Sequence, residues 1–366
     1  MVNDKYFMKM ALTLAKKAEG LTNPNPLVGA VLVKNGKVLS SGYHKKAGSL
    51  HAEIEALNKA GKRARGSTLY VTLEPCAHYG KTPPCVDRII EEGVKRVVIG
   101  ARDPNPVNNG KGIKRLRRKG VDVILGILQR EALGINRVFN LYITQKRPYV
   151  SIKAAQSLDG KIATFAGHSK WITNSSSRRF VHRLRSRVDA VLVGVNTVIK
   201  DNPRLSARAG NPKRQPMKII LDSTLKTPLK SRLLSGRGKD VIVAATDLAP
   251  KERIERFKRA GIDVAFFKED RGAVNIKSLL KFLAKREISH ILVEGGGSVI
   301  ASFLDKGLVE EVFIFISPKI IGGRDALTAV EGRGARLVSG AIKLKDIELK
   351  RFEEDILIHA NVYGNH

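Results

Sequence analysis

The sequence predicts an α/β protein built from two domains. Its 366 residues exceed the roughly 250–300 at which a single hydrophobic core stops growing. Apolar runs typical of buried strands alternate with segments of helical periodicity along the chain, which is the pattern of α/β folds. A polar, proline-marked link at 145–148 interrupts this alternation. We therefore expect a first domain over residues 1–145 and a second over residues 146–366.

The first domain is expected to fold as an α/β sandwich that opens with a helix over roughly 4–19. Apolar residues between Phe7 and Ala18 recur there at helical spacing. Asn35-Gly36 separates two strand-like runs and predicts a hairpin within 29–44. The elements expected after it are a helix at 51–60, a strand at 67–74, a helix at 85–92, a strand at 95–101, a helix at 111–120 and a strand at 121–127.

The second domain is expected to begin with a new strand at 149–155 and to continue with alternating strands and helices. Further strands are expected within 189–198, 217–222, 240–246, 288–294 and 310–318, and a helix at 251–261. A strand, a glycine-rich turn and a helix are expected over 293–304. No function is assigned to the region 224–290.

The chain is strongly basic, with 66 Lys and Arg against 34 Asp and Glu, and a net charge of +32. The charge is spread over both halves without a basic tail. Its densest run, 111–120, is expected to be the solvated face of a helix. We expect anionic small-molecule ligands rather than nucleic acid, because RNA-binding domains stack bases on aromatic residues and only 5% of this chain is aromatic. The excess of positive charge is larger than such ligands require.

The N-terminus does not resemble a signal peptide, since Asp4, Lys5, Lys9 and Lys16 interrupt its apolar residues. No uncharged apolar run approaches the ~18 residues of a membrane span. Two cysteines cannot form the disulfide framework of a small secreted protein. We therefore expect a soluble, cytoplasmic protein.

Both cysteines of the chain, Cys76 and Cys85, lie in the stretch TLEPCAHYGKTPPC and indicate a metal site. A catalytic zinc typically has three protein ligands and keeps a fourth position for water, and His51 would complete the set. Pro84 favours a helix start at Cys85, where the helix dipole favours a thiolate. Glu53, two residues after His51, would lie beside the metal and could move a proton from a zinc-bound water to a leaving amine.

The cysteine spacing departs from the general zinc-deaminase signature H-x-E…P-C-x-x-C, because eight residues rather than two separate the cysteines. Cys76 is therefore expected on a loop and Cys85 on a helix. Two alternatives stay open. The cysteines could be small buried apolar residues with His51 as a helix cap, or the zinc could be structural, with His44 or His78 as a fourth ligand.

Four segments of the first half resemble the deaminase part of the bifunctional riboflavin-biosynthesis deaminase/reductase family. They are NPNPLVGAVLV, HAEIEAL, YVTLEPCAHYGKTPPC and ARDPNPVNNGKG. The cysteine spacing of that family is the long one found here. The resemblance implies a cytidine-deaminase-like fold and zinc-hydroxide hydrolytic deamination of a diamino-hydroxy-pyrimidine that carries a ribosylamino 5-phosphate. It also implies substrate contacts by Asn25, His44, His78 and Lys81.

The glycine-rich turn of VEGGGSVIASFL could present backbone N–H groups to a phosphate at a helix start. It lacks the third glycine and the acidic residue of the Rossmann fingerprint, so a Rossmann domain is not expected. An ordinary tight strand–helix turn is the alternative. Arginines early in this domain could bind a phosphate through two hydrogen bonds, although any single one is more often a surface charge.

Five segments of the second half resemble the reductase part of the same family, whose fold is similar to dihydrofolate reductase. They are KAAQSLDGKIA, SKWIT, VGVNTVIKDNPRLSAR, VEGGGS and SPKIIGG. The resemblance implies hydride transfer from NADPH to C1 of the opened ribosyl group, giving a ribityl chain. The implied NADPH contacts are Ala155, Trp171, Thr197, Asp201, Gly296, Gly297, Ser298, Val299, Ile300, Ala301 and Ser302.

The substrate contacts expected in the second domain are Lys153, Ser169, Arg185, Leu205, Arg208 and Glu294. The resemblance has both arginines facing the 5-phosphate. Lys153 and Asp201 are candidates for the group that protonates the ring oxygen or nitrogen.

Together these features predict a bifunctional enzyme of riboflavin biosynthesis that deaminates and then reduces a phosphorylated pyrimidine. One zinc ion per chain and NADPH are the expected cofactors. We expect a homo-oligomer without nucleic-acid or membrane partners. Two rival functions stay open. One is a zinc deaminase of tRNA or nucleosides with a basic RNA-binding second domain, and the other is a non-catalytic basic binding protein with a structural zinc.

Overall fold

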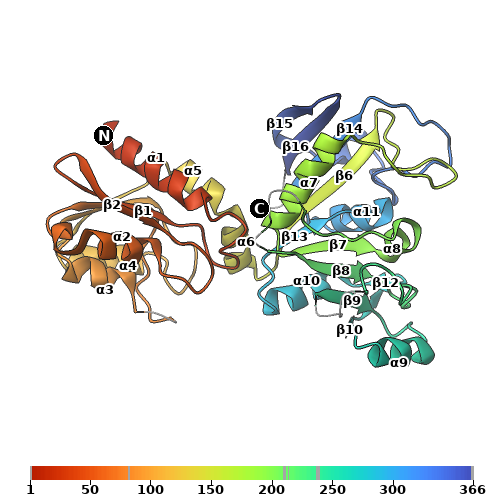
Figure 1. The fold of residues 1–366 in the computed structure, drawn as a ribbon, viewed down its shortest axis with the longest axis horizontal. Coiled ribbons are helices and arrows are strands. Elements are labelled where there is room, and N and C mark those ends of the chain that lie inside the picture. The colour runs from red at the N-terminus through yellow and green to blue at the C-terminus, as the bar shows by residue number, and fades with distance from the viewer. Residues whose placement is uncertain (1, 81–82, 209–211, 213, 236–239, 364–366) are drawn as a thin grey trace. The chain divides into compact units, whose positions relative to one another are not determined.

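The computed structural model describes residues 2–80, 83–208, 212, 214–235 and 240–363. The chain divides into two compact units, Met1–Arg147 and Pro148–His366 (Figure 1). Each unit has its own sheet, and apolar residues are buried on both faces of that sheet. The boundary between the two units lies between Arg147 and Pro148.

The sheet of the first unit is formed by β1 Gly29–Lys34, β2 Lys37–Tyr43, β3 Thr68–Leu73, β4 Arg96–Ala101 and β5 Asp122–Leu125. The order across the sheet is β2-β1-β3-β4-β5. β1 pairs antiparallel with β2 and β3, whereas β3, β4 and β5 are parallel. The predicted Asn35-Gly36 turn joins β1 to β2, with both residues at positive φ, a conformation that asparagine and glycine tolerate.

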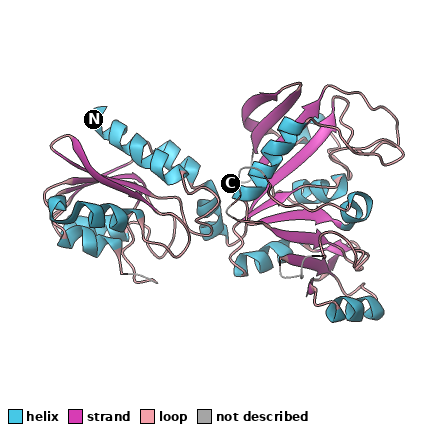
Figure 2. Cartoon of the chain, viewed as in Figure 1, coloured by secondary structure: helices cyan, strands magenta, loops and turns pink. Residues whose placement is uncertain are grey.

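Helices cover both faces of this sheet (Figure 2). One face carries α1 Val2–Lys16, α5 Gln129–Ile135 and α6 Arg137–Gln145, and the other carries α2 Ala52–Ala60, α3 Cys85–Glu91 and α4 Lys111–Arg118. Because side chains alternate along a strand, Val31 and Val33 pack with α1, while Ala30 and Leu32 pack with α2. The predicted α/β sandwich is confirmed.

The sheet of the second unit contains nine strands among the described residues. They are β6 Tyr149–Ser157, β7 Ala190–Gly194, β8 Met217–Leu221, β9 Val241–Ala245, β10 Asp263–Phe266, β13 His290–Val293, β14 Glu311–Ser317, β15 Leu344–Phe352 and β16 Asp355–Val362. The order is β10-β9-β8-β7-β13-β6-β14-β16-β15. The strands are parallel from β10 to β14, and β16 and β15 continue the sheet antiparallel. A separate short ribbon pairs β11 Glu269–Asp270 with β12 Ala273–Val274.

Helices also cover both faces of this second sheet. One face carries α7 Ser175–Arg187, α8 Val195–Asp201 and α9 Lys251–Arg259, and the other carries α10 Ile276–Lys285 and α11 Gly297–Asp305. The strands between them are buried apolar runs, as expected for a parallel sheet with two covered faces. The carboxyl ends of β6, β7 and β13 lie at one edge, where open α/β sheets usually bind their ligands.

Several elements were not predicted from the sequence. α7 buries Val181 and Leu184 between many charged residues, so its apolar periodicity is weak. β15 alternates only briefly, at Ile347 and Leu349, and both of these side chains are exposed. α10 is different, because its buried residues, Ile276, Leu279, Leu280 and Leu283, follow helical spacing and could have been found.

None of the described helices combines the length and the apolar character needed to cross a membrane.

Candidate functional site

Three elements of the first unit bring His51, Cys76 and Cys85 together. His51 stands at the N-terminus of α2, Cys76 follows the end of β3, and Cys85 is the first residue of α3, after Pro84. One ligand atom from each of the three lies within 4.8 Å of the others. The structure thus assembles the cluster of ligand-type residues that the sequence indicates.

Hydrogen bonds order these donor atoms. His51 Nδ1 lies 3.1 Å from Cys85 Sγ and 3.6 Å from Cys76 Sγ, and the Cys85 N–H donates to Cys76 Sγ at 3.2 Å. The hydrogen bond from the Cys85 thiol lowers the pKa of Cys76 to about 4. The hydrogen bond to Cys76 raises the pKa of His51 to about 9. One imidazole and two sulfurs at this spacing fit a tetrahedral zinc ion with one open position.

Glu53 lies in the first turn of α2 and is 4% exposed. Burial raises the pKa of its carboxyl group to about 7, although His51 opposes the shift. Among the described residues, Glu53 is outside the three-residue ligand cluster. A carboxyl group that titrates near neutrality beside metal ligands can both accept and release a proton.

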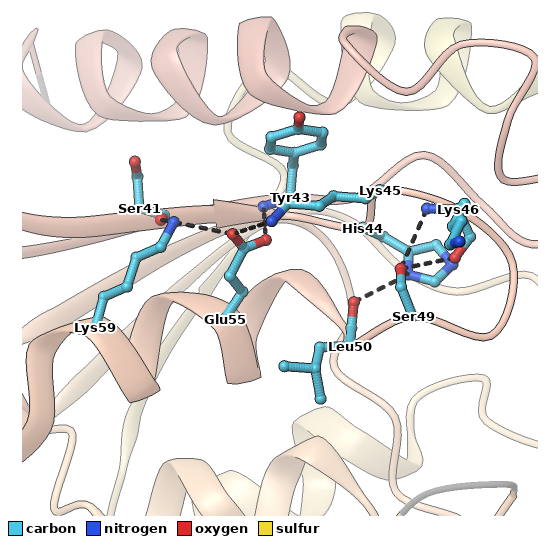
Figure 3. A network of polar contacts seen from close by, with 9 residues as sticks. All are labelled: Ser41, Tyr43, His44, Lys45, Lys46, Ser49, Leu50, Glu55 and Lys59. Carbon is cyan, nitrogen blue, oxygen red and sulfur yellow. Dashed lines mark hydrogen bonds and ion pairs between the residues drawn. The ribbon is translucent and has the colours of Figure 1, made fainter. Parts of the chain in front are cut away.

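Glu55 attaches α2 to β2 (Figure 3). Its carboxylate pairs with Lys45 at 3.0 Å and with Lys59 at 2.9 Å, and it accepts the Tyr43 N–H at 3.3 Å. Burial alone would raise the pKa of Glu55, but the hydrogen bonds from Lys59 and Lys45 hold this pKa below its ordinary value. These contacts fix the start of α2, and with it His51.

His44 lies beside the metal ligands. Its ring centre is 5.8 Å from that of His51, in an edge-to-face arrangement. Its Nδ1 lies 3.1 Å from the Leu50 carbonyl (Figure 3), and its Nε2 lies 3.3 Å from Asn25 Nδ2. Because the carbonyl requires a hydrogen on Nδ1, Nε2 accepts from the Asn25 amide. Burial lowers the pKa of His44, which favours this neutral form.

His78 presents a buried polar atom to the same region. Its Nδ1 has no hydrogen-bond partner among the described residues. Because buried polar atoms are nearly always hydrogen-bonded, this atom is available to a ligand or a water molecule. In the part of the chain that the structure describes, neither His78 nor His44 joins the ligand cluster. The alternative of a closed, four-ligand zinc site therefore has no support. The predicted contact Lys81 lies outside the described residues.

Asn108 clamps the peptide groups on both sides of Cys76, a role that was not predicted from the sequence. β3 has ended before Cys76, so none of the described strands pairs with this stretch. Asn108 Oδ1 accepts from the Ala77 N–H at 2.9 Å. Asn108 Nδ2 donates to the Pro75 carbonyl at 3.4 Å and to Asp103 Oδ2 at 3.0 Å. The Asn108 side chain is fully buried, so it positions Cys76 from within the protein.

Glu74 holds the loop that carries Asn108. Its carboxylate accepts the backbone N–H groups of Asp103 at 3.2 Å, Gly110 at 3.0 Å and Ile113 at 3.1 Å. These bonds tie the end of β3 to the start of α4. No pattern in the sequence indicates this arrangement, because the partners of Glu74 are backbone N–H groups 29, 36 and 39 positions away.

Replacing Asn108 by alanine is expected to weaken zinc binding by about 10–100-fold, the usual cost of losing a residue that orients a metal ligand. The Ala77 N–H and the Pro75 carbonyl lose their partner, and Cys76 gains freedom. Chelator competition measures the zinc Kd. Asn136→Ala is the matched control, because this buried amide clamps Leu27 instead, at 2.7 and 3.0 Å. An unchanged zinc Kd in Asn108→Ala would contradict the role of the clamp.

The second unit holds a cavity of about 510 Å³ around the carboxyl ends of β6, β7 and β13. This volume is in the range of small-molecule sites. Six residues predicted to contact the cofactor line it: Ala155, Trp171, Thr197, Asp201, Gly296 and Ile300. All six residues predicted to contact the substrate line it too: Lys153, Ser169, Arg185, Leu205, Arg208 and Glu294.

An ion-pair cluster forms part of this cavity. Glu294 accepts two hydrogen bonds from Arg185, at 2.6 and 2.8 Å, and lies 3.9 Å from Lys153 Nζ. Burial alone would raise the pKa of Glu294, but Arg185 and then Lys153 hold this pKa below its ordinary value. Burial lowers the pKa of Lys153. Arg185 is thus committed to Glu294, whereas the exposed Arg208 is better placed for a ligand phosphate.

A loop before α7 forms another part of the cavity lining. Ser169 Oγ donates to Asp201 Oδ1 at 2.9 Å, and Lys170 Nζ donates to the Asp201 carbonyl at 3.2 Å. The Trp171 side chain is 65% exposed, and the Arg178 guanidinium lies 4.4 Å from the ring centre. A flat aromatic surface is therefore available at this cavity.

Among the described residues, five of the predicted cofactor contacts do not line the cavity: Gly297, Ser298, Val299, Ala301 and Ser302. They lie within α11, which starts at Gly297 where the sequence suggested a longer turn. Close packing around α11 leaves no room for a side chain at two glycines. A Cβ at Gly297 would lie 2.5 Å from the Thr328 carbonyl oxygen, and a Cβ at Gly194 would lie 2.8 Å from the Val299 side chain. The helix start at Gly296 does open to the cavity, and backbone N–H groups at such a start suit a phosphate.

Two family models match the chain. The model described as "Cytidine and deoxycytidylate deaminase zinc-binding region" matches residues 1–101. The model described as "RibD C-terminal domain" matches residues 148–358. The first match covers His51, Cys76 and Cys85, and the second covers the whole lining of the cavity.

Proteins of similar sequence share the name "Riboflavin biosynthesis protein RibD". The protein of Aquifex aeolicus (strain VF5) is 46% identical, over 98% of this chain and 99% of its own length. That of Escherichia coli (strain K12) is 36% identical, over 98% and 99%.

Solved structures agree. Acinetobacter baumannii RibD, form 1, matches with a TM-score of 0.89 and 34% identity over 99% of both chains. A diaminohydroxyphosphoribosylaminopyrimidine deaminase/5-amino-6-(5-phosphoribosylamino)uracil reductase from Thermotoga maritima matches with a TM-score of 0.85 and 40% identity, over 98% and 99%.

Proposed function

Since the chain belongs to the RibD family of riboflavin-biosynthesis enzymes, we propose that its first unit holds the deaminase site and its second unit the reductase site. The protein is a bifunctional deaminase and reductase that uses zinc and NADPH, and both predicted folds are confirmed. The tRNA or nucleoside deaminase alternative is not favoured. The cluster of His51, Cys76 and Cys85, with Glu53 buried beside it, is the observation that carries the proposal.

The substrates follow from the Thermotoga maritima relative, whose name states both reactions. We assign to this chain the phosphorylated diaminopyrimidine as the deaminase substrate. Its deaminated product, a phosphoribosylamino-uracil, is then the reductase substrate.

The deamination breaks the bond between a ring carbon and its exocyclic amino group and forms a C–O bond at that carbon, with water consumed and ammonia released. Zinc held by His51, Cys76 and Cys85 supplies a Lewis acid that makes water nucleophilic near neutral pH. Glu53 takes a proton from the attacking water and delivers one to the departing nitrogen. Its raised pKa, about 7, suits both transfers.

Asn25, His44 and His78 are proposed to hold the pyrimidine. The Asn25 amide nitrogen donates to His44 Nε2 at 3.3 Å, and the Asn25 carbonyl oxygen is proposed to accept from the substrate amine. The unpartnered His78 Nδ1 offers a further polar contact. These side chains orient the ring so that its amine-bearing carbon faces the open metal position.

For the reduction, NADPH supplies a hydride to C1 of the ribosyl group. Trp171, Thr197, Asp201 and the start of α11 at Gly296 are proposed to hold it. The C1–O bond of the ribose ring breaks as the C1–H bond forms, so the released ring oxygen must take a proton. Lys153 is proposed as the donor, because burial lowers its pKa and makes its ammonium a stronger acid.

Replacing Arg208 by alanine is expected to raise the reductase KM for the phosphorylated substrate about tenfold, since one charge-assisted hydrogen bond is worth about 1.5–3 kcal/mol. The kcat should stay within about twofold, because the phosphate contact is the same in the ground and transition states. Arg179→Ala is the control, an exposed arginine of α7 whose side chain bonds to Ser176. An unchanged KM would remove Arg208 from the substrate site.

Following absorbance at 340 nm with the deaminated pyrimidine phosphate and NADPH tests the function as a whole. A loss of absorbance that depends on both compounds is the expected result. An RNA or nucleoside deaminase would give no signal, and neither would a non-catalytic binding protein.

We also propose that the protein forms a homo-oligomer. β15 is an edge strand with exposed apolar residues, among them Ile347 and Leu349 at 59% and 69% exposure. Exposed apolar edges of this kind favour association with another chain. A cytoplasmic location and the absence of a nucleic-acid partner stay predictions from composition.

A further inference from the structure

The loops that follow β6 and β14 are joined to each other. These strands are parallel neighbours, with Ser157 opposite Ser317 at their carboxyl ends. Just beyond, the Leu158 N–H donates to the Lys319 carbonyl at 2.7 Å. The segment SPKIIGG, which carries Lys319, therefore begins on a fixed backbone.

Asp159 strengthens this junction. Its carboxylate accepts the Ser157 hydroxyl at 2.6 Å and the N–H groups of Ile321 at 3.0 Å and Gly322 at 2.7 Å. The Ser157 hydroxyl, and after it these N–H groups, lower the pKa of Asp159 to about 2. The carboxylate is therefore charged at neutral pH, and Lys319 stands on a loop that is held on both sides.

Lys319 reaches from this loop to the lining of the cavity. Its Nζ donates to the Trp171 carbonyl at 2.8 Å and to the Ile172 carbonyl at 2.9 Å. Trp171 and Ile172 line the cavity, and Lys319 is not among the described lining residues. Any effect of Lys319 on a ligand must therefore act through the Trp171 segment.

The Trp171 segment depends on side-chain contacts for its position, because residues 162–174 form neither helix nor strand. Asp201 holds Ser169 and Lys170. Arg178 lies over the indole ring. Arg178 also donates to the Thr173 carbonyl, and Asp355 accepts the Asn174 N–H. Lys319 is bonded to the backbone of Trp171 itself, so it helps to fix the position of the ring.

We propose that Lys319 is a positioning residue for the reductase reaction, whose ammonium group holds the Trp171–Ile172 backbone so that the exposed indole meets NADPH in one orientation. The inference rests on the proposed function, which gives Trp171 its contact with NADPH. A charged donor shared by two carbonyls is stronger than a neutral hydrogen bond, which suits an exposed loop that must keep one shape.

The test compares wild type with Lys319→Met and Lys319→Arg. Lys319→Met keeps the apolar stem and removes the donor. Its KM for NADPH is expected to rise about tenfold, the effect of losing roughly one charge-assisted hydrogen bond, with kcat within about twofold. Lys319→Arg should restore most of the loss, because guanidinium donates to two acceptors. Lys306→Met is the control, a lysine of the same unit that pairs with Asp270 at 2.7 Å.

A second measurement needs no NADPH. Trp171 is the single tryptophan of the sequence, so its fluorescence reports on this segment. Lys319→Met should lower its anisotropy and increase its quenching by acrylamide, while ammonia release stays unchanged. Unchanged fluorescence would overturn the inference whatever the KM. Altered fluorescence with an unchanged KM for NADPH would uphold the tie to Lys319 and instead overturn the proposed contact between Trp171 and NADPH.

Discussion

Glu53→Gln is expected to lower kcat for ammonia release by about 10²–10⁴-fold, the usual contribution of a positioned acid–base group. Glutamine has nearly the same shape, but it can neither accept nor release the proton that the reaction moves. Zinc should stay bound, since Glu53 lies outside the cluster of His51, Cys76 and Cys85. NADPH oxidation on the deaminated substrate should be unchanged.

Metal analysis and two separate assays check this expectation. Glu131→Gln is the matched control, an exposed glutamate of α5 in the same unit. Loss of zinc in Glu53→Gln would make Glu53 a metal ligand. Ammonia release at the wild-type rate would remove Glu53 from the chemistry.

Glu294→Gln is expected to destabilise the second unit by about 3–5 kcal/mol, because removing one partner of a buried ion pair leaves the other charges uncompensated. The side chain of Glu294 is 4% exposed, and those of Arg185 and Lys153 are 13% and 17% exposed. Glutamine fills the same volume, so the loss measures charge rather than packing. Reductase activity should fall with it, since all three residues line the cavity.

Denaturant unfolding of the full chain, followed by the fluorescence of Trp171, measures this loss. Adding Arg185→Met to Glu294→Gln should recover part of it, because the variant then buries one cation fewer. A loss below about 1 kcal/mol would mean that the pair behaves as an exposed one. In the folded wild-type protein the pKa of Glu294 lies below its ordinary value of 4.5. The stabilisation from this ion pair is therefore fully present above pH 4.5 and is lost as the pH falls through the lowered pKa.

The metal centre could be predicted from the sequence because its residue types are chemically distinctive. Cys76 and Cys85 offer soft thiolates and His51 an imidazole, a set that suits zinc, and the chain holds no other cysteines. Glu53 follows His51 by two positions, so a helix that starts there places Glu53 beside the three ligands. The strands were predictable for a similar reason, since parallel strands that are buried on both faces read as continuous apolar runs.

The supporting residues could not be predicted in this way. Asn108 acts through backbone groups of Ala77 and Pro75, and no side-chain pattern reveals which peptide group an asparagine will meet. The pairing of Arg185 with Glu294 joins residues more than a hundred positions apart. The resemblance assigns Arg185 to the 5-phosphate, and that assignment stays a prediction. Its hydrogen bonds to Glu294 could not be read from the residue types alone.

The separate sheets of Met1–Arg147 and Pro148–His366 have a consequence for how such a chain changes over generations. A break in the chain at the polar link around 145–148 would cut none of the described strand pairings. Gene fusion or fission at that point therefore leaves the strands of each sheet together on one polypeptide.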